Sequence, residues 1–173
     1  MQVERPVDGL PRLPPIFVFP PRVPALWLSE RDHRIAPGMR GKTIIVHSLE
    51  QAVCALKVAR GLNCPVTLAS PPGAAAYTGA LWFREVIRQA EREVPEVEVT
   101  AVLDCGDKPG LVMAAFRQGV RTVRFTGRKA QSEKLEAMAE SEGYHLITGK
   151  LESLDLAGQS DPAEACRQWL LQS

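Results

Sequence analysis

The sequence has no excess of charge of either sign: its 173 residues carry a formal net charge of +1 at pH 7. A protein that neutralises many phosphates along DNA or RNA needs a basic surface, so nucleic acid is not expected as a partner. No apolar run approaches the ~20 residues that span a bilayer. The N-terminus mixes charge with proline and has no signal-peptide core. We therefore expect a soluble, cytoplasmic protein with no membrane partner.

Motifs for metals and disulfides are also missing. The four cysteines are scattered, with no C-x-x-C pair and no histidines at zinc spacing. The three histidines, His33, His47 and His145, lie far apart in the chain. The sequence predicts no metal site and no disulfide framework, and it identifies no cofactor.

Residues 1–41 differ in composition from the rest of the chain. They hold eight of the fourteen prolines and no lysine, together with apolar runs at 16–19 and 25–28. Because proline fixes φ and lacks an N–H, these runs suit extended or edge segments and not central strands. Their apolar content exceeds that of a solvated linker. We expect an arm that packs on its own domain or on a neighbouring subunit of a homo-oligomer.

Residues 42–173 alternate between apolar runs and amphipathic stretches, as in a single α/β domain. A capping box at Ser48 and Gln51 starts the first helix, and Asp161-Pro162 starts the last. Short connections imply parallel strands joined by right-handed crossovers. The predicted fold is an open, three-layer parallel sheet of about five β-α units, flavodoxin-like or Rossmann-like. The alternative is a partial (β/α) barrel completed by another subunit. The five strands are expected at 43–47, 65–69, 97–103, 122–125 and 144–147.

One pattern at the expected strand ends occurs twice. Two apolar runs each end in a hydroxyl residue, a glycine and a cation: Thr126, Gly127 and Arg128, then Thr148, Gly149 and Lys150. Parallel strands end at one edge of a sheet, where helix N-termini favour anions. We expect Arg128 and Lys150 to hold a phosphate or carboxylate, with the glycine backbones close to it. Otherwise both glycines only make turns and both cations lie in solvent.

Further candidates follow the other expected strands. Asp104 ends an apolar run, where a carboxylate suits a general base, and otherwise caps the next turn. Cys105 is a nucleophile if a helix N-terminus and a nearby lysine lower its pKa, and otherwise a small packing residue. His47 is an acid–base candidate or a hydrogen-bonded structural histidine. Ligand contacts are also expected from Ser70, Gly73 and Lys108.

Three of these residues give a resemblance. Asp104, Thr126 and Lys150 are similar in type and order to the conserved set of response-regulator receiver domains, over roughly residues 42–150. In that family the aspartate accepts phosphate and the other two sense it. The resemblance ends at the first strand, where His47 and Ser48 stand in place of an acidic pair for Mg²⁺.

Two functions follow from the sequence. The first is binding of a small anionic metabolite, such as a phosphorylated one, at the carboxyl edge of the sheet. An enzyme of the lyase, isomerase or transferase kind would use Asp104 or His47 for proton transfer. The alternative is a non-catalytic, degenerate receiver-like interaction module that works through the N-terminal arm.

Overall fold

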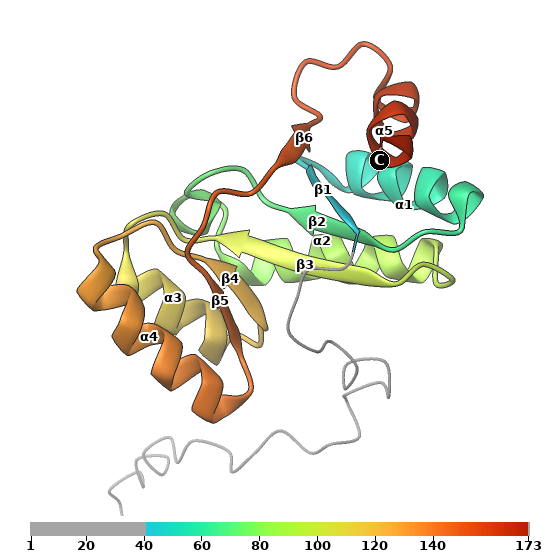
Figure 1. Ribbon diagram of the computed structural model, residues 1–173. Coiled ribbons are helices and arrows are strands. Elements are labelled where there is room, and N and C mark those ends of the chain that lie inside the picture. Colours follow the sequence, from blue (N-terminus) through green and yellow to red (C-terminus); the bar gives the residue numbers. More distant parts are fainter. Residues whose placement is uncertain (1–40, 173) are drawn as a thin grey trace, which may run out of the picture. The chain divides into compact units, whose positions relative to one another are not determined.

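The computed structural model describes residues 41–172, which form a six-stranded parallel sheet with helices packed on it (Figure 1). The predicted α/β class and open parallel sheet are confirmed. The predicted arm lies, except for Gly41, outside the described residues. The strands are β1 (Lys42–Ile45), β2 (Val66–Ala69), β3 (Val99–Asp104), β4 (Thr122–Arg124), β5 (His145–Ile147) and β6 (Ser153–Asp155). The helices are α1 (Leu49–Leu62), the 3-10 helix η3 (Ala74–Ala76), α2 (Ala80–Glu93), α3 (Pro109–Arg117), α4 (Lys129–Glu142) and α5 (Pro162–Leu171).

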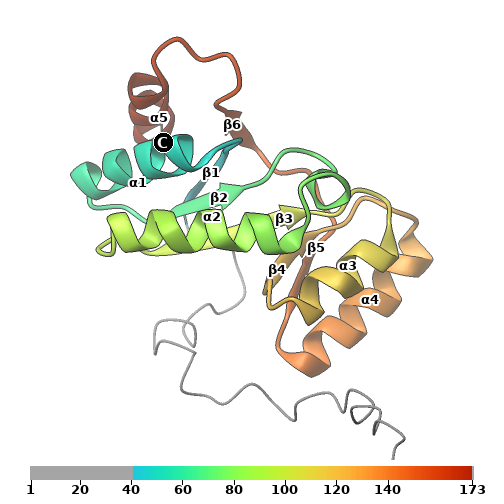
Figure 2. The same ribbon diagram turned by 180° about the vertical axis from the view of Figure 1, so that it is seen from behind.

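The strand order separates the two predicted architectures. The strands lie in the order β5-β4-β3-β2-β1-β6, and all neighbours are parallel. Successive right-handed crossovers in one direction place the connecting helices on one face. On that face α1 packs against both α2 and α5 (Figure 2). A flavodoxin-like sheet has the order 2-1-3-4-5 and helices on both faces. The observed order is that of the alternative, a partial (β/α) barrel, with one layer of helices instead of two.

The sheet must also be curled, because a short segment joins its two edges. Only residues 148–152 lie between β5 and β6, which form opposite edges of the sheet. In a flat sheet these edges would be five strand spacings apart, ~24 Å. Six residue steps reach at most ~20–22 Å. The segment therefore crosses the carboxyl end of a curved sheet (Figure 1).

Alternating side chains give the sheet two different faces. One face packs under the helices, where the buried cluster includes Ile44, Leu68, Leu103, Val123 and Phe125. We call the opposite face the inner face. The register places in its rows Thr43, Ile45, Thr67, Ala69, Thr100, Val102, Asp104, Thr122, Arg124, Ser153 and Asp155.

The helix starts follow the sequence signals. The Ser48 hydroxyl accepts from the Gln51 N–H at 3.3 Å, and Asp161 caps α5 by accepting from Glu164 N–H at 3.0 Å. The Gln51 side chain, however, accepts from the N–H of His47 and not of the cap residue. No helix within residues 41–172 is long and apolar enough to cross a membrane.

Candidate functional site

A cavity of about 210 Å³ opens on the inner face, at the carboxyl ends of the strands. Open α/β sheets bind ligands at this edge. Its walls come from β1 to β4, from the loop after β2 and from the segment that leads into β6, and half of the lining residues are apolar. The lining residues are Ile45, Ala69, Ser70, Pro72, Val102, Asp104, Arg124, Lys150, Leu151 and Ser153.

An ion pair forms the charged side of the cavity. Asp104 and Arg124 are register partners on β3 and β4, and Arg124 Nη1 lies 2.6 Å from Asp104 Oδ2. The Asp104 side chain is 6% exposed and that of Arg124 is 21% exposed. The attraction between two charges at this distance is strong, because both side chains are largely buried and little water screens them.

Asp104 also ties two loops to the pair. Its Oδ1 accepts from the N–H of Gly73 at 2.7 Å and from that of Gly106 at 2.8 Å. Both carboxylate oxygens are thus already engaged as acceptors. The structure places Asp104 as an internal anion that positions Arg124 and the loops, and not as a free proton acceptor.

Two cations face the cavity, and only one of them has its charge balanced. Arg124 Nε donates to the carbonyl of Gly149 at 3.2 Å, and Nη2 has no partner within residues 41–172. Lys150 is exposed and lines the cavity without an ion pair among the described residues. With Asp104 opposite Arg124, the cavity retains a formal charge of +1.

Three predicted residues, Ser70, Asp104 and Lys150, meet in this cavity. The Ser70 hydroxyl is already used, since it accepts from Asp104 N–H at 2.9 Å and donates to Pro71 O. Gly73 and Gly149 contribute through backbone bonds to the ion pair.

The first copy of the Thr-Gly-cation pattern does not line the cavity. Thr126 and Arg128 are exposed, and Arg128 is the N-cap residue of α4. Gly127 has a packing reason: a Cβ there would meet the Phe125 ring at 2.2 Å. The expected clamp between Arg128 and Lys150 is not formed.

Two further predicted ligand contacts lie elsewhere. Thr148 directs its hydroxyl toward Glu136 at 3.4 Å. Lys108 pairs with its exposed neighbour Asp107 at 3.2 Å. Neither side chain lines the cavity.

Cys105 is on the opposite face of the sheet, in the core under the helices, and is 1% exposed. Burial, with a smaller effect of the neighbouring Asp104 charge, raises the pKa of its thiol to about 12. The lowered pKa that a nucleophile requires is therefore not present, because the Cys105 thiol is buried in the apolar core.

His47 lies at the carboxyl end of β1 and contacts β6. Its Nε2 is 2.7 Å from Asp155 Oδ1. Asp155 was not predicted, because a three-residue polar edge strand gives no apolar pattern. Among residues 41–172 no group of three metal-ligating side chains is present.

Arg124 is the main functional candidate that sequence reasoning missed. A signal was available, since Thr122–Phe125 places a single charged residue inside an apolar run. Without the strand order, its partner Asp104 could not be identified. That order also differs from the 2-1-3-4-5 arrangement of receiver domains, so the receiver-like alternative is wrong in topology.

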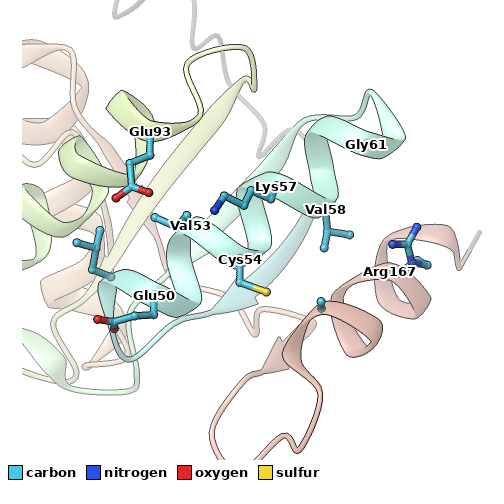
Figure 3. Close-up of a pocket in the computed structure, with 10 residues that line it drawn as sticks. Glu50, Val53, Cys54, Lys57, Val58, Gly61, Glu93 and Arg167 are labelled. Carbon is cyan, nitrogen blue, oxygen red and sulfur yellow. The ribbon is translucent and has the colours of Figure 1, made fainter.

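A larger hollow, of about 650 Å³, runs along the outer side of α1 between α2 and α5 (Figure 3). Its charged side chains come from three helices and have both signs. Glu50 and Glu93 balance Lys57 and Arg167. This groove therefore offers an anion no net attraction, whereas the carboxyl-edge cavity does.

Known proteins similar to this chain are fructose-bisphosphate aldolases. The aldolase of Xanthobacter flavus is 30% identical over 92 residues, which cover 53% of this chain and 26% of the relative. The class 2 aldolase of Synechocystis is 26% identical over 109 residues, covering 63% of this chain and 30% of the relative. The chain thus spans less than a third of the curated relatives it matches. No family model matches it.

A solved structure shares the fold. It is of a candidate fructose-1,6-biphosphate aldolase from Coccidioides immitis, with a TM-score of 0.51 and 22% sequence identity. The match covers 67% of this chain and 42% of the other. The chain is therefore an α/β protein with partial sequence similarity to fructose-bisphosphate aldolases.

Proposed function

We propose that this protein binds a phosphorylated sugar in the carboxyl-edge cavity, with Lys150 and Arg124 contacting the phosphate. The observation that carries the proposal is the convergence of both cations on one cavity at the strand ends. They come from separate elements, Arg124 from β4 and Lys150 from the crossing segment. A guanidinium held by a carboxylate is preorganised to donate its remaining N–H groups to phosphate oxygens.

The charge of the cavity favours a phosphate over a neutral ligand. A phosphate monoester carries about −1.5 to −2 at pH 7. The Asp104 charge is directed at Arg124, so the charge of Lys150 is the main uncompensated attraction. Backbone donors contribute less here, because Gly73 and Gly106 N–H are already given to Asp104.

The similar proteins support the sugar part of the ligand. Their names describe enzymes that act on a sugar carrying two phosphates. The same names make lyase chemistry the reaction class to assay first. Because both carboxylate oxygens of Asp104 already accept hydrogen bonds, we assign Asp104 to positioning Arg124, and His47 remains the candidate for proton transfer.

Isothermal titration calorimetry with fructose 1,6-bisphosphate tests the proposal. Lys150→Met should weaken binding about 10-fold or more, since a charge-assisted hydrogen bond contributes ~1.5–3 kcal/mol. Lys150 is exposed, so the variant should fold normally. The matched control is Lys134→Met, an exposed lysine on α4 that does not line the cavity. Equal affinities for wild type and K150M would refute the assignment.

The same samples also separate an enzyme from a binding protein. A lyase converts the sugar bisphosphate to triose phosphates, and ³¹P NMR detects their new resonances. A binding protein leaves the two phosphate resonances of the sugar bisphosphate unchanged. Cleavage that is slowed in K150M but not in K134M would assign the reaction to this cavity.

A further inference from the structure

The His47–Asp155 pair belongs to the same face as the cavity. Ile45 and Ser153 line the cavity. His47 follows Ile45, the last residue of β1, by two residues, and Asp155 lies two residues after Ser153 on β6. Side chains two residues apart in extended chain point to the same side. Val46, between Ile45 and His47, is buried in the core under the helices, which agrees with this alternation.

Hydrogen bonds fix both members of the pair. Asp155 Oδ1 also accepts from the N–H of Ala157 at 2.8 Å. The Gln51 side chain accepts from His47 N–H at 2.8 Å and donates to Leu156 O at 3.2 Å. One side chain therefore joins the turn after β1 to the turn after β6, and the imidazole is held relative to the cavity.

The carboxylate determines which imidazole nitrogen is left for a ligand. Asp155 can only accept, so Nε2 of neutral His47 carries the hydrogen and donates it. Nδ1 is then an acceptor, and it has no hydrogen-bond partner within residues 41–172. The His47 side chain is 34% exposed, so part of the imidazole is open to a ligand.

We propose that Nδ1 of His47, held by Asp155, accepts a hydrogen bond from a sugar hydroxyl of the ligand whose phosphate contacts Lys150 and Arg124. This inference rests on the proposed function. Arg124 lies on β4 and Lys150 on the crossing segment, whereas the His47–Asp155 pair lies at the carboxyl ends of β1 and β6, outside the residues that line the cavity. The cavity itself is therefore cationic, and the neighbouring β1–β6 side carries a carboxylate. The Asp155 carboxylate disfavours a second phosphate at its end. The ligand class is therefore a sugar monophosphate, with its phosphate at the cationic end and its hydroxyls at His47.

Calorimetric titrations with inorganic phosphate, fructose 6-phosphate and fructose 1,6-bisphosphate test this arrangement. Wild type should bind fructose 6-phosphate at least several-fold more tightly than either of the others. In His47→Ala and Asp155→Ala, the ratio of the affinity for fructose 6-phosphate to that for inorganic phosphate should fall by about 3- to 10-fold, which is the contribution of one hydrogen bond. Affinity for inorganic phosphate should not change. Asp155→Asn keeps an acceptor oxygen for His47 Nε2, so it should retain most of the affinity ratio of fructose 6-phosphate to inorganic phosphate. Because it lacks the negative charge, it should bind fructose 1,6-bisphosphate more nearly as tightly as fructose 6-phosphate.

The controls separate this inference from the proposed function. Asp107→Ala removes an exposed carboxylate outside the cavity and should leave all three affinities unchanged. If H47A weakens inorganic phosphate as much as fructose 6-phosphate, or keeps the full sugar advantage, the hydroxyl contact is wrong even when K150M behaves as expected. If wild type binds none of the three, the proposed function and this inference both fail.

Discussion

The Asp104–Arg124 pair is expected to stabilise the fold as well as the site. Asp104→Ala removes the partner of a cation whose side chain is 21% exposed, and it leaves the Gly73 and Gly106 N–H groups without their acceptor. Removing one member of a buried pair typically costs about 3–5 kcal/mol. Because Arg124 keeps some solvent contact, we expect a loss of about 3–4 kcal/mol in the free energy of unfolding.

Urea denaturation followed by circular dichroism measures this loss. Asp104→Asn is the informative companion, since its Oδ1 can still accept both glycine N–H groups while its NH₂ faces Arg124. It should lose less than D104A but clearly more than Asp107→Ala, an exposed aspartate whose removal should change stability by no more than ~0.5 kcal/mol. A loss below about 1 kcal/mol in D104A, or a D104N variant less stable than D104A, would contradict the described role of the carboxylate.

Two further predictions concern the packing at Gly127 and the pKa values of two buried cysteines. Gly127→Ala should lower the free energy of unfolding by about 1–3 kcal/mol, because its Cβ would clash with the Phe125 ring. Gly149→Ala meets nothing within 4 Å and should lower it by less than ~0.5 kcal/mol. Equal urea midpoints for the two variants would exclude the packing role of Gly127. Burial raises the pKa of Cys105 and of Cys166 from 9.0 to about 12, so between these pH values the unfolded chain has released protons that the folded chain retains. Stability should be unaffected by these groups below about pH 9 and then fall by ~1.4 kcal/mol per pH unit for each cysteine. The free energy of unfolding, measured from pH 8 to 11, should decline less steeply with pH in C105A than in wild type. The same slope in both proteins would contradict the raised pKa of Cys105.

Local patterns were sufficient for most elements of this fold. The caps at Ser48 and Asp161 mark helix starts that the structure places as expected. These signals act within one turn of chain, so the sequence displays them directly. The 3-10 helix between β2 and α2 was not among the expected elements. It lies between Gly73 and Gly79, which both have positive φ and precede the starts of η3 and α2.

The site was harder to predict because it depends on strand order. Lys150 and Asp104 were identified from their places after strands, but Arg124 was not, because its importance comes from the register that sets it beside Asp104. The duplicated Thr-Gly-cation pattern was misleading for a similar reason. Its two copies follow neighbouring strands, yet only the second enters the segment that crosses the cavity.

The pairing of β6 with β1 has a consequence for how the chain folds. The indole of Trp169 on α5 donates to the carbonyl of Thr43 at 3.0 Å, across 126 residues of sequence. Within β1 to β5, each pair of hydrogen-bonded strands is consecutive in the chain, so these strands can assemble progressively. The outer edge of β1 must wait for β6, and contacts of such sequence separation carry a large loop-closure entropy and form slowly. During synthesis, the wall of the cavity formed by the crossing segment and β6 therefore forms only after the rest of the sheet.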